Sequence, residues 1–321
     1  MQSQFSKVRK RVAKRRDRRD WSQYNHWQSQ EVLLACHALR VLIESSTIHD
    51  WQRQNGRPRV PRRVIVLCLL VKAYFNVSYR RLHGLLVLLR EPLGLDKVPH
   101  FNTVAKYGRS PGMTNTLERL LAETAHPFWL VEKVLSVDAT GLILQGSGAW
   151  RANKRDDAPR DFAKIHVLSG AKTRATLAIR TTRGTRHDST QFKPLVERVP
   201  DDAAAERITA DTAYWNRDGC RVAKDAGLTP YFKPKKNARF WKWPKDDFEK
   251  MNRFAHQFPN RFAAVYHQRS TSESRNATEK LLFGDRVRSR LPVARRNEVL
   301  CREVVHNVRL LTKGPPSGGE N

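Results

Sequence analysis

Cysteine is scarce in this sequence, and the few cysteines that occur are far apart. The four, in a chain of 321 residues, are Cys36, Cys68, Cys220 and Cys301. No two of them have the close spacing of a zinc site, and their number is far below the dense pattern of a small disulfide-bonded protein. They are therefore expected to be small buried apolar side chains, and neither a cysteine-based zinc site nor a disulfide framework is indicated.

Long apolar runs are also missing. The two longest, VIVLCLLV at 64–71 and LLVLL at 85–89, fall far short of the roughly 20 residues needed to cross a bilayer. The first twenty residues are basic, but no apolar run follows them as it would in a secretory signal. The sequence therefore predicts a cytoplasmic protein without a membrane partner.

Acidic residues are far fewer than basic residues in this chain. The chain has 60 Lys and Arg against 31 Asp and Glu, a formal net charge of +29 and a pI near 10.7. Such a charge attracts polyanions and predicts a nucleic-acid partner whose binding depends strongly on salt. A ribosomal or chromatin-like binder has similar charge, but 321 residues with 40% hydrophobic content can bury a sizeable core and would ordinarily form two domains.

The two ends of the chain have the composition of extensions rather than of folded segments. Residues 1–20 hold nine Lys or Arg against two Asp, which predicts a basic arm along the DNA backbone. Residues 312–321 are rich in Gly and Pro and are expected to be disordered.

Residues 21–130 carry apolar side chains at helical spacing. The pattern is plain in EVLLACHALRVLIES, PRRVIVLCLLVKAYF and SYRRLHGLLVLLRE, and after a loop FNTVAKYGR predicts a short helix that displays Lys106 and Arg109. These segments predict a helical N-terminal DNA-binding domain, in which a helix-turn-helix could enter a major groove. The alternative is a plain helical bundle that positions the rest of the chain.

The periodicity changes over residues 131–311. LSVDATGLIL, FAKIHVLSGA and TLAIRTTRG predict three successive strands, and ITADTAYW and TPYFKPKK predict two more that alternate with helices. RRNEVLCREVVHNVRLLT predicts a final packing helix. This order predicts an α/β fold with a mixed sheet and helices on both faces.

Three carboxylates stand out in this second part. Asp138 and Asp211 each end an apolar, β-prone run, and Glu273 lies in the stretch AVYHQRSTSESRNATEKLLFGDRV. An unpaired carboxylate in an apolar strand is costly, so Asp138 is expected to have a partner or a function. Carboxylates on three separate elements can meet only through the fold.

The surroundings of Glu273 add two cations and a phenol. If residues 266–280 formed one α-helix, three side chains would project within about 60° of the direction of Tyr266 around the helix axis. They are Arg269, Glu273 and Lys280. A carboxylate between cations suits a metal ion beside a phosphodiester, because the carboxylate binds the ion while Arg and Lys neutralise phosphate oxygens. The same spacing is also compatible with a solvated salt-bridged surface.

Together, Asp138, Asp211 and Glu273, with Lys280 after them, resemble the DDE transposases of bacterial and archaeal insertion sequences. The resemblance is closest to the group whose third motif reads Tyr, two residues, Arg, three residues, Glu, six residues, Lys, and it covers about residues 132–290. It implies a ribonuclease-H-like sheet with the first Asp on the first strand, the second at the end of the fourth, and the Glu on a later helix.

The resemblance also implies the chemistry. Two Mg²⁺ ions, or Mn²⁺ in their place, would be held by Asp138, Asp211 and Glu273, with Asp138 bridging, and would promote hydrolysis and strand transfer. Arg269 and Lys280 would hold DNA phosphates with support from Tyr266. The expected partners are the terminal inverted repeats of the element and its target DNA, bound by a homodimer in the nucleoid.

Two further clusters are candidates for the same site or for DNA. His187 and Asp188 precede a predicted helix, where they could approach the active site, although N-capping alone would explain Asp188. Trp241 and Trp243 alternate with lysines in KPKKNARFWKWPK, which suits stacking on single-stranded or distorted DNA ends.

Other functions remain open from the residues alone. One is a ribonuclease-H-like nuclease that does not join strands, and another is an inactive transposase-derived protein that only binds DNA. The end sequence, the target preference and the excision pathway have no signature in the chain.

Overall fold

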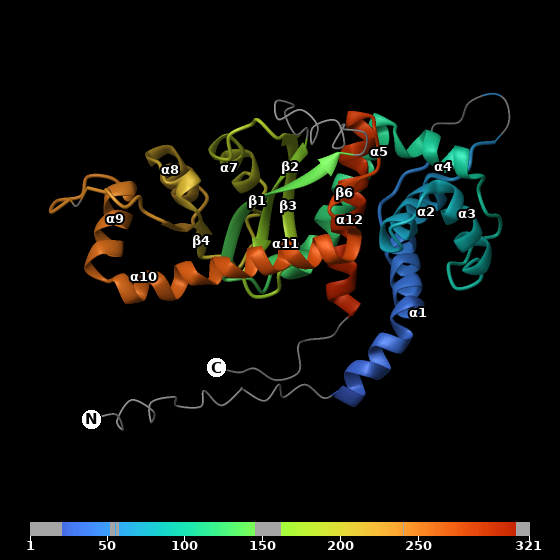
Figure 1. Cartoon of the computed structure of the whole chain (residues 1–321), viewed down its shortest axis with the longest axis horizontal. Coiled ribbons are helices and arrows are strands. Elements are labelled where there is room, and N and C mark those ends of the chain that lie inside the picture. Colours follow the sequence, from blue (N-terminus) through green and yellow to red (C-terminus); the bar gives the residue numbers. More distant parts are fainter. Residues whose placement is uncertain (1–20, 52–54, 56–57, 145–161, 240, 313–321) are drawn as a thin grey trace, which may run out of the picture.

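The structure is a computed structural model that describes residues 21–51, 55, 58–144, 162–239 and 241–312. The predicted basic arm and nearly all of the predicted C-terminal tail lie outside these residues. Helices of the N-terminal part gather at one end of the molecule, and the sheet with its flanking helices forms the rest (Figure 1). No helix in the described part is long and apolar enough to cross a membrane.

The N-terminal part is helical, as predicted. Its helices are α1 (Trp21–Ser45), α2 (Arg62–Tyr74), α3 (Tyr79–Leu88), α4 (Phe101–Gly108) and α5 (Pro111–Trp129). Helix α3 begins where the Ser78 side chain accepts a hydrogen bond from the backbone N–H of Arg81. Helix α2 is buried continuously from Ile65 to Ala73, which explains why its sequence is apolar on every side.

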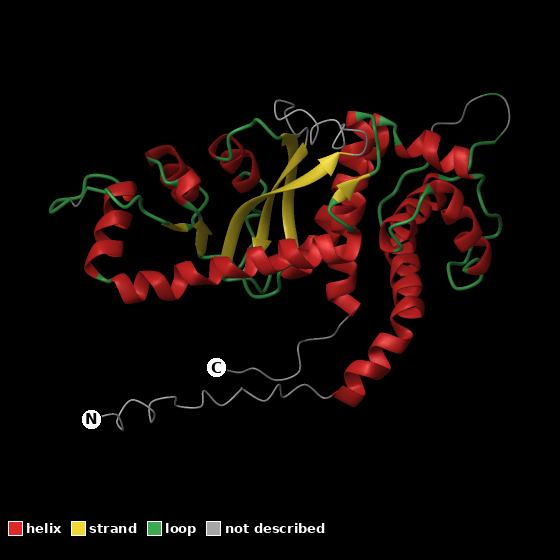
Figure 2. Cartoon of the chain, viewed as in Figure 1, coloured by secondary structure: helices red, strands yellow, loops and turns green. Residues whose placement is uncertain are grey.

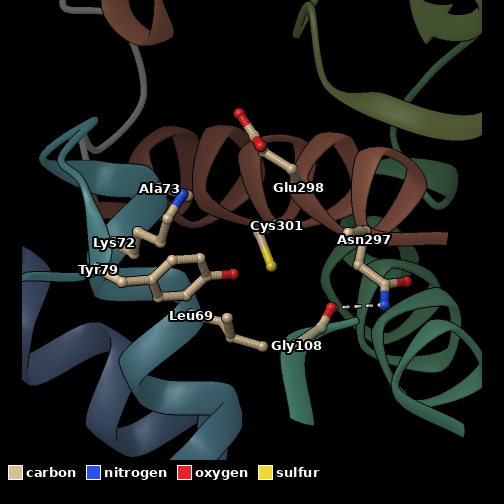
Figure 3. A pocket seen from close by; sticks show the side chains of 9 residues that line it. Leu69, Lys72, Ala73, Tyr79, Gly108, Asn297, Glu298 and Cys301 are labelled. Atoms are coloured by element: carbon tan, nitrogen blue, oxygen red, sulfur yellow. Dashed lines mark hydrogen bonds between the residues drawn. The ribbon is translucent and has the colours of Figure 1, made fainter. Parts of the chain in front are cut away.

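The N-terminal helices pack closely against α12 (Pro292–Thr312), the last helix of the chain. A cavity of about 20 Å³ between α2 and α12 has room for one water molecule (Figure 3). Its lining includes Gly108, where a Cβ atom would come within 2.9 Å of Leu69 Cδ2. The Asn297 side chain donates a hydrogen bond to the Gly108 carbonyl at 2.9 Å, so α4 is held directly on α12.

The sheet has the predicted mixed topology. Its strands are β1 (Val134–Leu144), β2 (Phe162–Gly170), β3 (Thr176–Arg183), β4 (Arg207–Ala210) and β5 (Thr229–Phe232), in the order β3-β2-β1-β4-β5. The first three are antiparallel, and β4 and β5 run parallel to β1 (Figure 2). This arrangement confirms the ribonuclease-H-like expectation.

The parallel strands are shorter than the sequence predicts, and one strand was not expected. Strand β4 was predicted to continue to Trp215 but ends at Ala210, because Asp211 caps a 3₁₀ turn that follows at once. Strand β5 was predicted to reach Lys236 but ends at Phe232. The added strand is β6 (Arg286–Val287), which pairs in parallel with the far end of β1.

Helices cover the sheet on both faces. Helices α7 (Ser189–Val196) and α8 (Arg217–Asp225) contribute to one apolar cluster, whereas α12 and the end of α11 (Ser270–Phe283) contribute to the other. Helices α9 (Asp247–Gln257) and α10 (Pro259–Tyr266) make up a compact helical connection before Glu273. Both faces are thus buried, as a largely apolar β1 requires.

The helical N-terminal part and the sheet share a core. One apolar cluster joins residues of α1 to α5 with sheet residues such as Ile165 and Val167 and with α12. Helix α5 reaches both clusters, with Leu117 in the first and Phe128 in the second. The boundary predicted at residue 130 therefore falls inside a packed region, at the short connection between α5 and β1.

The predicted single helix carrying Tyr266 to Lys280 is interrupted. Tyr266 ends α10, Arg269 lies in a 3₁₀ turn (His267–Arg269), and only Glu273 and Lys280 belong to α11. The uniform 100° spacing assumed from the sequence is wrong there, since a 3₁₀ turn advances about 120° per residue. Even so, α10 and α11 follow each other along nearly one line across the sheet (Figure 1).

A buried polar network joins α11 to α12 and β3. Arg275 and Glu303 form a fully buried ion pair, and Thr176 on β3 accepts a hydrogen bond from Arg275 at 2.7 Å. Glu279 is buried beside them, and neither of its carboxylate oxygens has a hydrogen-bond partner among the described residues. Burial, together with the negative charge of Glu303, raises the pKa of Glu279 to about 7.

Replacing Glu279 tests this assignment through stability. The folded protein holds the Glu279 proton more tightly than the unfolded chain does, so wild-type stability falls as pH rises from about 4.5 toward about 7. Glu279→Gln imitates the protonated form and is expected to raise the free energy of unfolding at pH 8 by on the order of 1–3 kcal/mol. Urea unfolding from pH 5 to pH 8 should show this gain shrinking as pH falls.

The matched control is Glu197→Gln. Glu197 is exposed at the C-terminal end of α7 and pairs with Lys193 of that helix at 3.8 Å. Its replacement should change stability by less than about 1 kcal/mol, with little dependence on pH over this range. A Glu279→Gln effect equally small at pH 8 would contradict the raised pKa.

Candidate active site

Asp138 lies on the central strand of the sheet. The four residues before it, Val134 to Val137, are buried, and its own side chain is 16% exposed. Its Oδ2 accepts a hydrogen bond from the Asn276 side chain at 3.0 Å, and its Oδ1 lies 3.5 Å from a guanidinium nitrogen of Arg269. Asp138 thus has the partners that a carboxylate in an apolar strand is expected to need, and these are the donors Asn276 and Arg269.

Asp211 emerges beside Asp138 because of strand register. Val137 and Ala210 are partners in the parallel β1–β4 pair, and the residue that follows each of them is an aspartate. Adjacent strands are about 4.8 Å apart, which brings the two carboxylates to neighbouring positions. The Asp211 side chain accepts a hydrogen bond from the backbone N–H of Ala213 at 2.9 Å, and this cap turns the chain away from the sheet.

Glu273 approaches from the first turn of α11. Its side chain is 63% exposed, and its Oε1 accepts a hydrogen bond from Arg269 at 2.7 Å. Helix α11 is held on β1 by a buried hydrogen bond of 2.6 Å from the Ser272 hydroxyl to that of Ser136. Glu273 therefore faces the site from a helix that is anchored one residue away.

The three carboxylates influence one another electrostatically. Burial raises the pKa of Asp138, and the negative charges of Asp211 and Glu273 raise it further. Arg269 and the backbone N–H of Ala139 act in the opposite direction, and the net shift is upward. Three carboxylates against one guanidinium leave the site with excess negative charge, which a divalent cation would relieve.

Arg269 lies between two of the carboxylates. Its guanidinium reaches Asp138 through Nη1 and Glu273 through Nη2, and its side chain is only 17% exposed. Tyr266 is among the groups that favour the charged form of Arg269 and raise its pKa, and the Tyr266 ring is stacked on Phe262 at 6.0 Å. The sequence suggested that Arg269 holds DNA phosphate, and here it acts as the counter-ion of the acidic site.

The donor set suits a hard divalent cation. Carboxylate oxygens are what Mg²⁺ and Mn²⁺ prefer, and Asp138 is a half-buried carboxylate with other carboxylates nearby. In the described part of the chain, no three His, Cys, Asp or Glu side chains have converged closely enough to hold one ion. Glu273 instead accepts its hydrogen bond from Arg269.

Asp188, the residue before α7, forms a second polar cluster with two residues of β2. Its carboxylate pairs with Lys164 at 2.6 Å and lies 3.4 Å from the His166 ring, whereas the neighbouring His187 is exposed. Asp188 makes no side-chain capping bond to α7, so the capping explanation does not hold. Burial lowers the pKa of His166 to about 4, although Asp188 opposes the shift, and the ring is neutral at pH 7.

The two tryptophans of the basic loop have different surroundings. Trp241 is half-buried with its ring against Phe248, at 5.9 Å between centroids. Trp243 is 76% exposed, and the ammonium group of Lys242 lies over its ring at 5.9 Å from the centroid. Only Trp243 presents an open aromatic surface.

The remaining predicted DNA-binding residues are on the surface or at its edge. Lys106 and Arg109 are exposed in and just after α4, and Lys280 is half-buried on α11, about two turns beyond Glu273. None of them contacts the three carboxylates through an ion pair among the described residues. Their role in binding DNA stays a prediction.

Two residues of this region were missed from the sequence. Asn276 follows Glu273 by one helical turn, so its position on the same face was readable. His166 lies between the apolar residues Ile165 and Val167, which was also a signal. The partner of each lies far away in the sequence, and neither contact has a local signature.

Removing the positive charge of Arg269 tests whether it is the counter-ion of Asp138. In the absence of divalent ions, Arg269→Gln should lower the free energy of unfolding at pH 8 by roughly 1–3 kcal/mol, because Asp138 then lacks its cation. Adding Asp138→Asn to that variant should recover much of the loss. Urea unfolding in EDTA measures both, and a double variant no more stable than Arg269→Gln would argue against the coupling.

Arg221 offers a control, because it also forms an Arg–Asp ion pair but lies at the surface. It pairs with Asp218 on α8, and both side chains are about two-thirds exposed. Arg221→Gln should change stability by less than about 1 kcal/mol, because solvent screens this pair.

A family model described as the transposase DDE domain matches residues 129–308, more than half of the chain. The match begins at the end of α5 and extends nearly to the end of α12, so it spans the whole sheet and all three carboxylates.

Proposed function

The chain belongs to the transposase DDE-domain family, and from this premise we propose that it cuts DNA at the ends of a mobile element and joins the freed 3′-hydroxyl to target DNA. One observation carries most of the proposal, namely the register of β1 and β4 that puts Asp138 next to Asp211, with Glu273 close enough to raise the pKa of Asp138. The net charge of +29 supports DNA as the substrate.

The three carboxylates are proposed to hold the divalent cations, two Mg²⁺ or Mn²⁺, with Asp138 shared between them. When bound, such ions activate a water or hydroxyl and neutralise charge on the phosphoryl oxygens. This requires Glu273 to exchange its Arg269 contact for the cation. The released guanidinium of Arg269 would then be free to pair with a DNA phosphate. Arg269 could thus pair with Glu273 in the absence of DNA and with a phosphate in its presence.

The surface residues are proposed to position the DNA around this site. Lys280 lies beyond Glu273 on α11 and would bind a phosphate of the same strand, while Lys106 and Arg109 on the N-terminal helices would bind the element's end. A dimer on paired ends, in the nucleoid of the host cell, completes the proposal.

Carboxylate replacements test the chemistry directly. Asp138→Asn, Asp211→Asn and Glu273→Gln are each expected to reduce cleavage of the element's ends in Mg²⁺ by at least about 10³-fold, because each removes a proposed ligand of the ions. DNA binding measured by gel shift should persist. The exposed Asp225 at the end of α8 provides the control Asp225→Asn, which should cleave like the wild type.

The same assay separates the rival functions. A wild-type protein that cleaves but never joins ends to a plasmid target is a nuclease. One that binds the ends but never cleaves them is a DNA-binding derivative. Normal cleavage by Glu273→Gln would refute the assignment of the third carboxylate.

The two tryptophans make a second test. Trp243→Ala should weaken binding to DNA with an unpaired end by roughly fivefold to 100-fold, the effect of one base stacked on an aromatic ring, and leave stability nearly unchanged. Trp241→Ala should mainly lower stability, because it removes the contact with Phe248. Fluorescence anisotropy with tailed and blunt duplexes, together with thermal unfolding, measures both variants. Equal effects of the two replacements on tailed DNA would contradict the distinction.

A further inference from the structure

Asn276 contacts the carboxylate oxygen of Asp138 that Arg269 does not contact. The Asn276 side chain is 8% exposed, and its Nδ2 donates to Asp138 Oδ2 at 3.0 Å. The other oxygen, Oδ1, is the one turned toward Arg269. The two oxygens of the Asp138 carboxylate therefore have different partners: Asn276 bonds to Oδ2, and Arg269 lies near Oδ1.

The orientation of the Asn276 amide is determined by a second contact. Arg275 Nη1 donates to Asn276 Oδ1 at 2.8 Å. If the amide were turned over, its NH₂ group would face the guanidinium and its oxygen would face the Asp138 carboxylate, so both contacts would become repulsive. Arg275 thus ensures that Asn276 presents a donor to Asp138.

Arg275 is itself held by contacts with two other elements, α12 and β3. It is 1% exposed on α11 and ion-pairs with Glu303 of α12, and its Nη2 donates to the Thr176 hydroxyl of β3 at 2.7 Å. The Thr176 hydroxyl donates in turn to Glu303 at 2.5 Å. Asn307 of α12 bonds both backbone groups of Thr176, at 2.9 and 2.8 Å, so the threonine cannot move independently.

We propose that Asn276 is a positioning residue, which fixes the rotation of the Asp138 carboxylate through the chain Glu303–Arg275–Asn276 and keeps Oδ1 turned into the shared acidic site. The inference rests on the proposed function, since it concerns the same carboxylate. Groups that orient a ligand by hydrogen bonding typically change metal affinity 10-fold to 100-fold when they are removed. The buried network then serves the acidic site as well as the packing of α11 on α12.

A purely structural role makes a different prediction. If the network only fastens α11 to α12, loss of Asn276 lowers stability but leaves the folded protein's affinity for a divalent ion unchanged. Asn297 is the matched comparison, because it is also buried, donates to Gly108 at 2.9 Å and accepts from Thr114 at 2.6 Å, but lies away from the carboxylates.

The experiment measures Mn²⁺ binding by the full chain without DNA, from the signal of free Mn²⁺ in electron paramagnetic resonance, at a temperature where each variant is folded. Asn276→Ala is expected to weaken Mn²⁺ binding by roughly tenfold or more. Asn297→Ala should lose stability but bind Mn²⁺ within about twofold of the wild type. Thermal unfolding of all three proteins accompanies the titration.

The outcomes separate this inference from the function it rests on. If the wild type binds Mn²⁺ and Asn276→Ala binds it equally well, the positioning role is overturned and the proposed function stands. If the wild type binds no Mn²⁺, both are overturned together.

Should Asn276→Ala fail to fold, the wild type gives the answer. The side-chain amide signals of Asn276 in a ¹⁵N spectrum are expected to shift when Mg²⁺ is added, because their acceptor is Asp138, whereas those of Asn297 should not. Unshifted Asn276 signals in a protein that binds Mg²⁺ would overturn the inference.

Discussion

The placement of one carboxylate in the middle of an apolar sheet determines much of the architecture around it. Asp138 follows four buried residues on the central strand, where a charge without partners would cost several kcal/mol. The compensation comes from Asn276 and Arg269, which reach it from α11 and from the 3₁₀ turn before α11. Because both donors must arrive together, the path of the chain from Tyr266 to Lys280 is constrained by this single side chain.

The interruption between α10 and α11 follows from the same requirement. Arg269 contacts Asp138 and Glu273 at once, and Tyr266 supports it from the end of α10. The tighter 3₁₀ turn changes the direction of the Arg269 side chain relative to a continuous α-helix. The four residues of the motif thus meet through two helices and a turn rather than along one helical face.

The acidic site is connected to the far side of the molecule by buried polar contacts. The ion pair of Arg275 and Glu303 anchors α11 to α12, and α12 in turn packs on the N-terminal helices. In a low-dielectric interior such contacts are rigid, since each lost partner leaves a buried polar group unsatisfied. Two side chains, Arg275 and Asn276, thus link Glu303 of α12 to Asp138.

The sequence by itself determined the family, the order of strands and helices, and the three carboxylates as candidates, because each of these leaves a local signature. Periodicity marks the elements, and an acid at the end of an apolar run is visible without a structure. The lengths of β4 and β5, the helix break before Arg269 and the difference between Trp241 and Trp243 were not readable in this way. They depend on caps and on neighbours that the fold supplies.

Only the tertiary structure decided which donors reach Asp138 and what holds those donors in place. Asn276 and Asp138 are 138 residues apart, and Arg275 and Thr176 are 99 apart. Contacts over such separations exist only once β1, β3, α11 and α12 are packed together, because no local preference links their sequences. Single residues therefore indicated the chemistry of the site, whereas its geometry depends on how the elements pack.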